Sequence, residues 1–324
     1  MKNYLITGGA GFIGSRLVQS LVANGNNVVV FDNLERGRLG RLDSCKDKIN
    51  IVNGDIRNYE QVESAVKGID VIYHLAAVNG TENFYKEPRR VLDVGLRGVL
   101  NIMDAALKLN TEHVIVASSA EVYQTPIHTP TSEEEMLKVP NSLEARYSYG
   151  GSKIASELVA LNWGREMNCV QVFRPHNIYG PDMGWKHVIP NLINKIQNTK
   201  EDGNPDLKIF GSGNQTRAFC FVDDLINGLH TMESKGEGHD IFHIGTEEEL
   251  SIKELVNFIA EIMNIKVNII PSEAPKGETE KRCPDISKMR KLGYEPSISI
   301  ASGLEKTVKW YLDNPPSTSN NKLL

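Results

Sequence analysis

The stretch Thr7-Gly8-Gly9-Ala10-Gly11-Phe12-Ile13-Gly14 directly follows the apolar run Tyr4-Leu5-Ile6 and opens a segment with apolar residues at helical spacing. A strand, a glycine turn and a helix start in this order aim backbone N–H groups and a helix N-terminus at phosphate, and glycines allow close approach. The stretch therefore predicts a site for the pyrophosphate of a dinucleotide. The residues expected to contact it are Gly8, Gly11, Phe12, Ile13 and Gly14.

A carboxylate after the next apolar run favours NAD over NADP as this dinucleotide. The run 27–31 ends at Asp32, about twenty residues beyond the glycines, where a carboxylate accepts hydrogen bonds from the adenosine ribose. The same charge would repel a 2′-phosphate. No arginine directly follows Asp32, although Arg36 and Arg38 lie close by.

Strand and helix patterns alternate through residues 1–175. This alternation predicts an α/β fold of the Rossmann-like, doubly wound kind, with helices on both faces of a parallel sheet. Further strands are expected at 49–52, 70–74, 113–118 and 170–173, and helices at 58–67, 88–109 and 154–165. The helix at 88–109 carries two apolar stripes, so that one can cover the sheet while the other is buried either inside the domain or against a second subunit.

Beyond residue 181 the alternation becomes irregular, which predicts a smaller C-terminal α/β lobe that binds the substrate. We therefore divide the chain into an NAD-binding domain (1–175), a mainly substrate-binding lobe (176–314) and a polar, flexible tail (315–324). The lobe is expected to contain helices at 188–197, 250–263 and 300–312, and short strands at 207–210 and 241–244.

Composition excludes several classes of partner. The chain has 324 residues, a formal net charge of −5 and no concentrated Lys/Arg run, so nucleic acid is not an expected partner. Its four cysteines lack metal-finger spacing, so we expect thiols in a reducing compartment and no metal. We see neither a signal peptide nor an apolar run of about 18 residues, so no membrane contact and a cytoplasmic location are expected.

Tyr149 and Lys153 are candidates for the chemistry. They stand four residues apart at the start of a predicted helix and so share one face. A free tyrosine loses its proton near about pH 10, and a nearby ammonium together with a positive nicotinamide ring would favour the phenolate at neutral pH. Such a pair also occurs by chance on helix surfaces, so the assignment needs further residues.

Those residues follow the strand at 113–118, in the segment Ser118-Ser119-Ala120-Glu121-Val122-Tyr123. Open α/β sheets bind their ligands at the carboxyl ends of strands. With these motifs the chain resembles the extended short-chain dehydrogenase/reductase family, in particular its NAD-dependent nucleotide-sugar epimerase/dehydratase branch. The resemblance also covers Gly54-Asp55-Ile56-Arg57, His74-Leu75-Ala76-Ala77 and Arg174-Pro175-His176-Asn177-Ile178-Tyr179-Gly180-Pro181.

The resemblance implies a role for each matching position. Tyr149 would remove the proton from a sugar hydroxyl, usually at C4, while hydride passes to NAD, and Ser119 would hydrogen-bond the same oxygen. Lys153 would bind the nicotinamide ribose and tune the tyrosine. On the adenine side, the resemblance implies contacts from Asp55, Ile56 and Ala76.

It further implies a nucleotide-diphosphate sugar as the substrate and a homodimer built on the helices at 88–109 and 149–165. Asn177, Arg217 and Arg282 match the positions that bind the diphosphate. Guanidinium groups suit phosphate because they offer bidentate donors and stay charged.

Glu121 leaves the reaction open. A C4 epimerase needs no such carboxylate, and we place epimerase first. The alternative is a 4,6-dehydratase, decarboxylase or related lyase in which Glu121 abstracts a proton at C5, although Ala120 stands where the dehydratases carry an Asp. Glu121 could instead fix its loop through backbone N–H groups. A third hypothesis is a non-catalytic NAD-binding sensor.

Two residues depart from the family pattern near the expected sugar site. Gly95 replaces an Asn, which would enlarge the pocket or admit water. Gln124 replaces a glycine and would add an amide donor and acceptor there.

Overall fold

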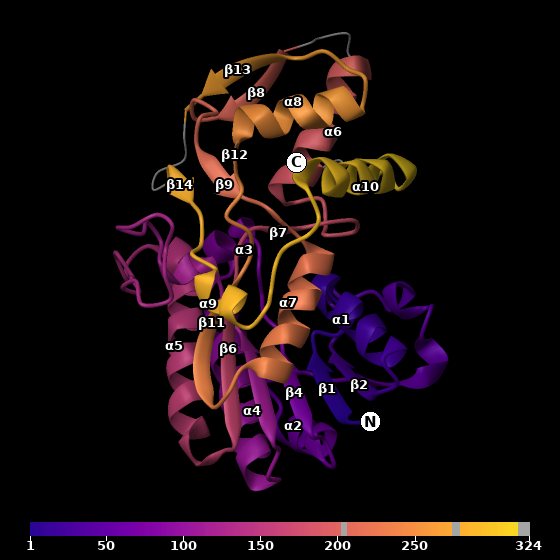
Figure 1. The fold of residues 1–324 in the computed structure, drawn as a ribbon, viewed down its shortest axis with the longest axis vertical. Coiled ribbons are helices and arrows are strands. Elements are labelled where there is room, and N and C mark those ends of the chain that lie inside the picture. The colour runs from indigo at the N-terminus through magenta and orange to yellow at the C-terminus, as the bar shows by residue number, and fades with distance from the viewer. Residues whose placement is uncertain (202–205, 274–278, 317–324) are drawn as a thin grey trace.

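The computed structural model describes residues 1–201, 206–273 and 279–316 and is built on one central sheet (Figure 1). Seven strands, all parallel, lie in the order β11-β6-β5-β4-β1-β2-β3. The predicted Rossmann-like α/β fold is therefore confirmed. The strands are β1 (Asn3–Thr7), β2 (Asn27–Asp32), β3 (Ile49–Asn53), β4 (Val71–His74), β5 (His113–Ala117), β6 (Cys169–Pro175) and β11 (His239–Ile244).

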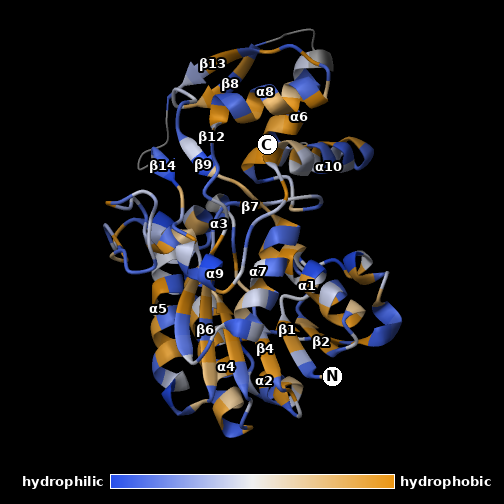
Figure 2. Ribbon diagram, viewed as in Figure 1, coloured by the Kyte–Doolittle hydropathy of each residue, from blue (hydrophilic) through white to orange (hydrophobic). Residues whose placement is uncertain are grey.

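Helices cover both faces of this sheet because successive strand residues point to opposite sides. Ile6 packs under α1 (Phe12–Ala23) and α7 (Val222–Lys235), whereas Leu5 packs on the opposite face. That second face is covered by α2 (Tyr59–Val66), α4 (Pro88–Lys108) and α5 (Ser148–Trp163). Figure 2 shows apolar residues along the central strands, enclosed by helices that mix apolar and polar residues.

Two elements differ from the sequence-based prediction. The strand expected in the smaller lobe at 241–244 is β11, which pairs with β6 and completes the central sheet. Helix α7 was not predicted, although Leu225, Leu229 and Met232 recur on one face and are buried against the sheet. The chain thus leaves the sheet after β6 and returns to it, so residues 176–314 contribute to both lobes.

The smaller lobe has its own apolar core. This core joins α6 (Val188–Glu201), α8 (Ile252–Ile262) and α10 (Ile300–Asp313) to the parallel pair β8 (Asp206–Phe210) and β13 (Asn268–Ser272). A separate three-stranded sheet has the order β12 (Glu249–Ser251), β9 (Thr216–Ala218) and β14 (Lys281–Arg282). A further pair consists of β10 (Cys220–Phe221) and β7 (Ile178–Tyr179). Shorter helices are α3 (Thr81–Lys86) and α9 (Ser287–Lys291), with 3₁₀ turns at Leu39–Leu42, Lys46–Lys48, Ala120–Val122, Ala145–Tyr147 and Gly164–Glu166.

Two further sequence-based expectations concern the C-terminal tail and membrane-spanning helices. Most of the expected flexible tail, residues 317–324, lies outside the described residues. Across 1–201, 206–273 and 279–316, no helix combines the length and apolar character that crossing a bilayer requires.

Candidate active site

The glycine loop lies between β1 and α1 and is shaped for close backbone approach. Gly8 has a φ of 70°, and a Cβ on Gly14 would stand 2.2 Å from the Gly8 carbonyl oxygen. Helix α1 begins after Gly11, which has no side chain that could cap the first N–H groups. Free N–H groups at a helix start attract an anion, so the loop fits the pyrophosphate of NAD.

Asp32 stands at the carboxyl end of β2 and holds this loop. Its Oδ2 accepts a hydrogen bond from Ala10 N at 3.0 Å, and its Oδ1 accepts one from Leu34 N at 2.8 Å. A carboxylate accepts about four hydrogen bonds in all, so capacity remains for a ribose hydroxyl. The ribose contact stays a prediction that this geometry permits.

The residues expected near adenine lie along the same edge of the sheet. Ala76 packs on the glycine loop, since its backbone nitrogen would stand 3.0 Å from a Cβ on Gly8. The Asp55 carboxylate pairs with Arg57 at 2.6 Å, and the hydrogen bond from Arg57 is the main reason that the pKa of Asp55 is lowered. The Ile56 side chain is buried in the core beside Gly98, and its carbonyl oxygen accepts a hydrogen bond from Asn101 Nδ2 at 2.8 Å, so its adenine contact stays a prediction.

The structure brings Ser119, Tyr149 and Lys153 together at the carboxyl ends of β5 and its neighbours. Tyr149 is buried and forms a hydrogen bond with the Ser119 hydroxyl. Lys153 Nζ lies 5.8 Å from the centroid of the Tyr149 ring and donates a hydrogen bond to the Ala117 carbonyl at 2.6 Å. This is the arrangement that the sequence predicted for proton transfer, and the catalytic roles themselves remain predictions.

Burial dominates the titration of both groups. It raises the pKa of Tyr149 to about 12, although the Ser119 hydrogen bond and the charge of Arg36 act in the opposite direction. It also lowers the pKa of Lys153 to about 8. In the protein without NAD the phenol is therefore neutral at pH 7, and a further positive charge beside it is needed before Tyr149 can act as a base.

Sequence reasoning missed Phe84, which lies on α3. Its ring stacks on that of Tyr149, with centroids 4.7 Å apart and an angle of 9° between the planes. The contact fixes the plane of the phenol. The two residues are far apart in the chain, so no local pattern could have indicated it.

The Glu121 carboxylate forms an ion pair with the Arg282 guanidinium. Burial alone would raise the pKa of Glu121, but the attraction and hydrogen bond of Arg282, together with the charges of Arg146 and Arg217, lower it overall. Glu121 is also close enough to Tyr149 to influence its pKa. The carboxylate is thus ionised and engaged by arginine. The short loop around it is fixed by Ser119 Oγ, which accepts from Glu121 N at 3.2 Å.

The two arginines expected to bind the diphosphate lie side by side on two paired strands. Arg217 on β9 and Arg282 on β14 are direct partners in a parallel pair, so their side chains leave the same face of that sheet. The third expected residue, Asn177, has a φ of 42° and donates from Nδ2 to the Ala218 carbonyl at 3.1 Å. Asn177 is thereby tied to β9 next to Arg217. Sequence reasoning did not include Arg146, whose charge also reaches Glu121.

Both departures from the family pattern turn out to be packing features, contrary to our expectations. A Cβ on Gly95 would stand 2.9 Å from Ser152 Cβ, so this glycine lets α4 and α5 approach closely and does not enlarge the sugar pocket. Gln124 is buried, donates from Nε2 to the Glu121 carbonyl at 2.6 Å and accepts from Thr279 through its main-chain oxygen. Its amide nitrogen therefore braces the loop that contains Ser119 and Glu121.

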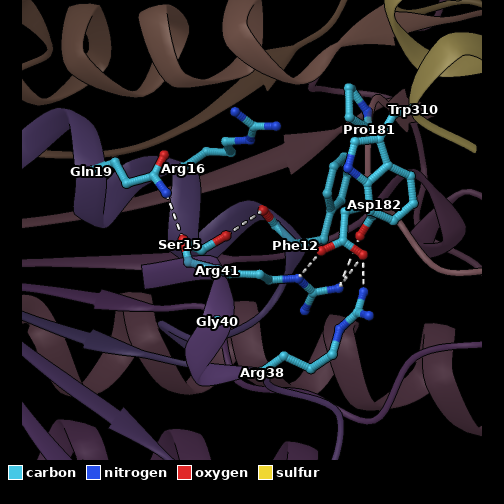
Figure 3. Close-up of a pocket in the computed structure, with 10 residues that line it drawn as sticks. All are labelled: Phe12, Ser15, Arg16, Gln19, Arg38, Gly40, Arg41, Pro181, Asp182 and Trp310. Atoms are coloured by element: carbon cyan, nitrogen blue, oxygen red, sulfur yellow. Dashed lines mark hydrogen bonds and ion pairs between the residues drawn. The ribbon is translucent and has the colours of Figure 1, made fainter. Parts of the chain in front are cut away.

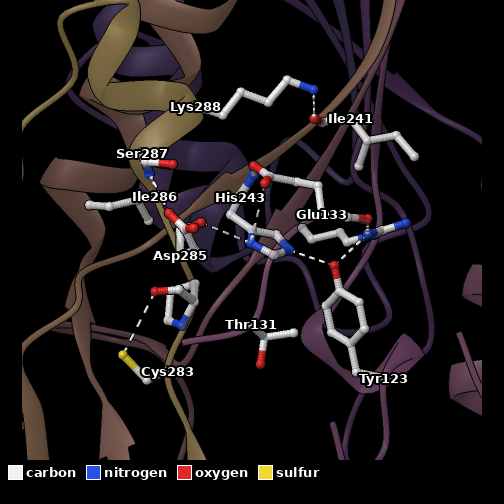
Figure 4. Close-up of polar contacts among 12 residues, drawn as sticks. Tyr123, Thr131, Glu133, Ile241, His243, Cys283, Asp285, Ile286, Ser287 and Lys288 are labelled. Carbon is white, nitrogen blue, oxygen red and sulfur yellow. Dashed lines mark hydrogen bonds and ion pairs between the residues drawn. The ribbon is translucent and has the colours of Figure 1, made fainter. Parts of the chain in front are cut away.

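A buried polar network supports the segment that contains Ser119 and Glu121. The Tyr123 hydroxyl lies 2.5 Å from His243 Nε2 (Figure 4). It also accepts a hydrogen bond from Arg174 Nη1. Arg174 in turn binds Glu157 through two nitrogens, at 2.8 and 2.6 Å. Glu157 lies one turn beyond Lys153 on α5, so the network couples the helix of the candidate base to the loop of its partners.

A glycine loop, an acidic residue after β2 and a Ser, Tyr and Lys set at one sheet edge are the features expected of an enzyme that uses a dinucleotide cofactor. Residues 4–245 match the model of the NAD dependent epimerase/dehydratase family, and the chain belongs to this family. It is accordingly an enzyme whose cofactor is NAD.

Relatives with three different activities share nearly the full length of this chain. The UDP-N-acetyl-alpha-D-glucosaminuronate decarboxylase of Bacillus cytotoxicus is 33% identical over 96% of this chain and 98% of its own length. The structure of UDP-glucose 4-epimerase from Thermotoga maritima with UDP-glucose is 27% identical, covers 96% and 99% of the two chains and has a TM-score of 0.86. That of dTDP-glucose 4,6-dehydratase from Streptomyces venezuelae with NAD bound is 29% identical, covers 96% and 97%, and has the same TM-score of 0.86. Because proteins with three different activities share this fold, the fold alone does not decide which reaction this chain catalyses.

Proposed function

We propose that this chain is a nucleotide-sugar epimerase that inverts the sugar at C4 through transient oxidation. The proposal depends on one observation: Tyr149 is buried, hydrogen-bonded to Ser119 and accompanied by Lys153. With NAD bound as the hydride acceptor, these three groups supply the proton transfer that reversible oxidation of a secondary alcohol requires.

In the proposed reaction, Tyr149, Ser119 and Lys153 each have a separate role. Tyr149 takes the proton of the C4 hydroxyl as hydride leaves C4, and Ser119 holds the oxygen. NAD, when bound, supplies the hydride acceptor. Lys153 stabilises the phenolate by its charge. Once the keto-sugar has turned, C4 receives the hydride on its other face and Tyr149 returns the proton, so no NAD is consumed overall.

The substrate side supports a diphosphate. Arg217 and Arg282 leave one face of a small sheet, and Asn177 is attached to the same strand. Bidentate, permanently charged donors suit a group that keeps its negative charges throughout the reaction.

A second candidate is decarboxylation of a nucleotide-activated uronic acid, favoured by Glu121 and Arg282 beside Tyr149 and by the name of the Bacillus cytotoxicus relative. Arg282 keeps the pKa of Glu121 low, which makes Glu121 a weak base for a proton on C5. That weakens the case for a dehydratase. Decarboxylation needs no base at C5, because the electrons of the broken carbon–carboxylate bond flow toward the C4 ketone as carbon dioxide leaves, and the resulting enolate takes up a proton at C5 from solvent.

Incubation with UDP- and dTDP-hexoses and with UDP-glucuronic acid, followed by mass spectrometry and NMR, separates these reactions. We expect a product of unchanged mass inverted at C4, with no net NADH. Loss of carbon dioxide would select the second candidate, and loss of water would select a dehydratase. Glu121→Gln should leave epimerisation in place and suppress loss of water, whereas loss of carbon dioxide, which needs no base at C5, should persist. Failure to invert any sugar in the panel would overturn the first proposal.

A further inference from the structure

Asp182 links the smaller lobe to the loop that follows Asp32, here called the cofactor loop (residues 33–42). It comes directly after Pro181 and has a φ of 65° (Figure 3). Arg41 donates three hydrogen bonds to Asp182. Its Nε donates to Oδ2 at 2.8 Å, and its Nη2 donates to Oδ1 at 3.2 Å and to the main-chain oxygen at 2.9 Å. Arg38 pairs with the same carboxylate. One acidic residue of the second lobe thus binds two arginines of the first.

The contact continues from Arg41 into the glycine loop. Arg41 Nη1 donates to the Ala10 carbonyl at 3.1 Å, and the backbone N–H of Arg38 donates to the same oxygen at 3.0 Å. Ala10 N in turn donates to Asp32 Oδ2 at 3.0 Å. An unbroken chain of hydrogen bonds therefore joins Asp182 to the carboxylate expected to hold the adenosine ribose.

This junction differs from an ordinary surface ion pair. The side chains of Arg41 and Asp182 are 11% and 19% exposed, so solvent screens them poorly. A second ion pair, between Lys186 and Glu82, ties the same part of the smaller lobe to α3. Charge-assisted, bidentate contacts of this kind fix both distance and orientation.

We propose that Arg41 and Asp182 are positioning residues that lock the cofactor loop against the smaller lobe and thereby slow the release of NAD. The glycine loop and Asp32, which would hold the dinucleotide, are both attached to this chain of hydrogen bonds. Release requires the loop to move, and the loop moves only when Arg41 and Asp182 separate. The inference needs NAD binding alone and holds whichever sugar reaction the enzyme performs.

The test measures how fast the loaded protein releases NADH when challenged with excess NAD, followed by the loss of protein-bound NADH fluorescence. Asp182→Asn keeps the size of the side chain and tolerates positive φ, but removes the charge. Loss of a charge-assisted hydrogen bond corresponds to about a 10- to 100-fold faster release. Arg41→Lys keeps the charge but loses the fork and should accelerate release in the same direction.

The matched control is Lys108→Gln, which breaks the ion pair between Lys108 of α4 and Glu63 of α2 and should leave release unchanged. Thermal melting of each variant accompanies the measurement, and release is followed well below every melting temperature. If Asp182→Asn does not fold, Arg41→Lys decides the matter. Release at the wild-type rate from a folded variant, even one that melts earlier, would overturn the proposal.

Discussion

The side chain of Gln124 lies directly against Gly150 at the start of α5. A methyl group on Gly150 would stand 2.5 Å from Gln124 Nε2 and 2.9 Å from the Glu121 carbonyl oxygen. Gln124 has a φ of 55°, a conformation that glycine adopts more easily, and its amide bonds to that same carbonyl. The contact sets the spacing between the helix of Tyr149 and the loop of Ser119.

Gly150→Ala should disturb this spacing. Because the carbonyl cannot give way as a side-chain tip can, we expect destabilisation by about 1–3 kcal/mol and a clear loss of turnover. Chemical denaturation and steady-state kinetics measure the two effects. Gly151→Ala is the matched control, since the nearest atom to its methyl group is 3.7 Å away. This substitution should be neutral or stabilise the helix by about 0.5–1 kcal/mol. Equal behaviour of the two variants would contradict the packing argument.

Arg174→Met should be among the most damaging substitutions in the protein. Arg174 and Glu157 are almost fully buried, so removing the guanidinium leaves the Glu157 carboxylate without its bidentate partner. Breaking a buried pair in this way costs about 3–5 kcal/mol. Denaturant unfolding followed by circular dichroism gives the value, with the exposed Arg290→Met, which costs about 0–1 kcal/mol, as the comparison. A loss below 1 kcal/mol for Arg174→Met would show that Glu157 finds another partner.

Turnover should depend on pH through Lys153. Burial lowers the pKa of its ammonium to about 8, and Lys153 assists Tyr149 only while it is protonated. The rate should therefore fall as the pH rises through that value. Lys153→Arg keeps a charge across this range, and its residual activity should lose the alkaline decline. Measuring kcat from pH 6 to pH 10 tests this, and an alkaline decline that persists in Lys153→Arg would assign it to another group.

The apolar residues on the outer faces of α4 and α5 fit the dimer that the family resemblance implies. Leu158 is 59% exposed, and Leu92 and Trp163 on the same pair of helices are also exposed. We predict that Leu158→Asp converts a dimer into a monomer, measured by light scattering at micromolar concentration. Leu312→Asp, at an exposed position of α10 in the other lobe, should leave the mass unchanged. A monomeric wild-type chain would rule out this interface.

Local sequence patterns were enough to predict the strands and the helix that surround the glycine loop. Glycine spacing and apolar periodicity predicted β1, α1 and β2, and the structure has them at Asn3–Thr7, Phe12–Ala23 and Asn27–Asp32. By contrast, β11 was placed in the wrong lobe because an apolar run does not reveal which strand it will pair with. The expected roles of Gly95 and Gln124 failed for a related reason: each depends on a neighbour across a helix crossing or a loop.

The sequence by itself determined the fold class, because apolar periodicity and glycine spacing act within short segments. It also predicted the dinucleotide site from that spacing, and the Ser119, Tyr149 and Lys153 set from the family resemblance. Only the tertiary structure decided the partners of the charges. Glu121 meets Arg282 across 161 residues, and Arg41 meets Asp182 across 141. Such pairs are fixed by how the smaller lobe returns to the sheet, and neither composition nor periodicity encodes which opposite charge a buried side chain will reach.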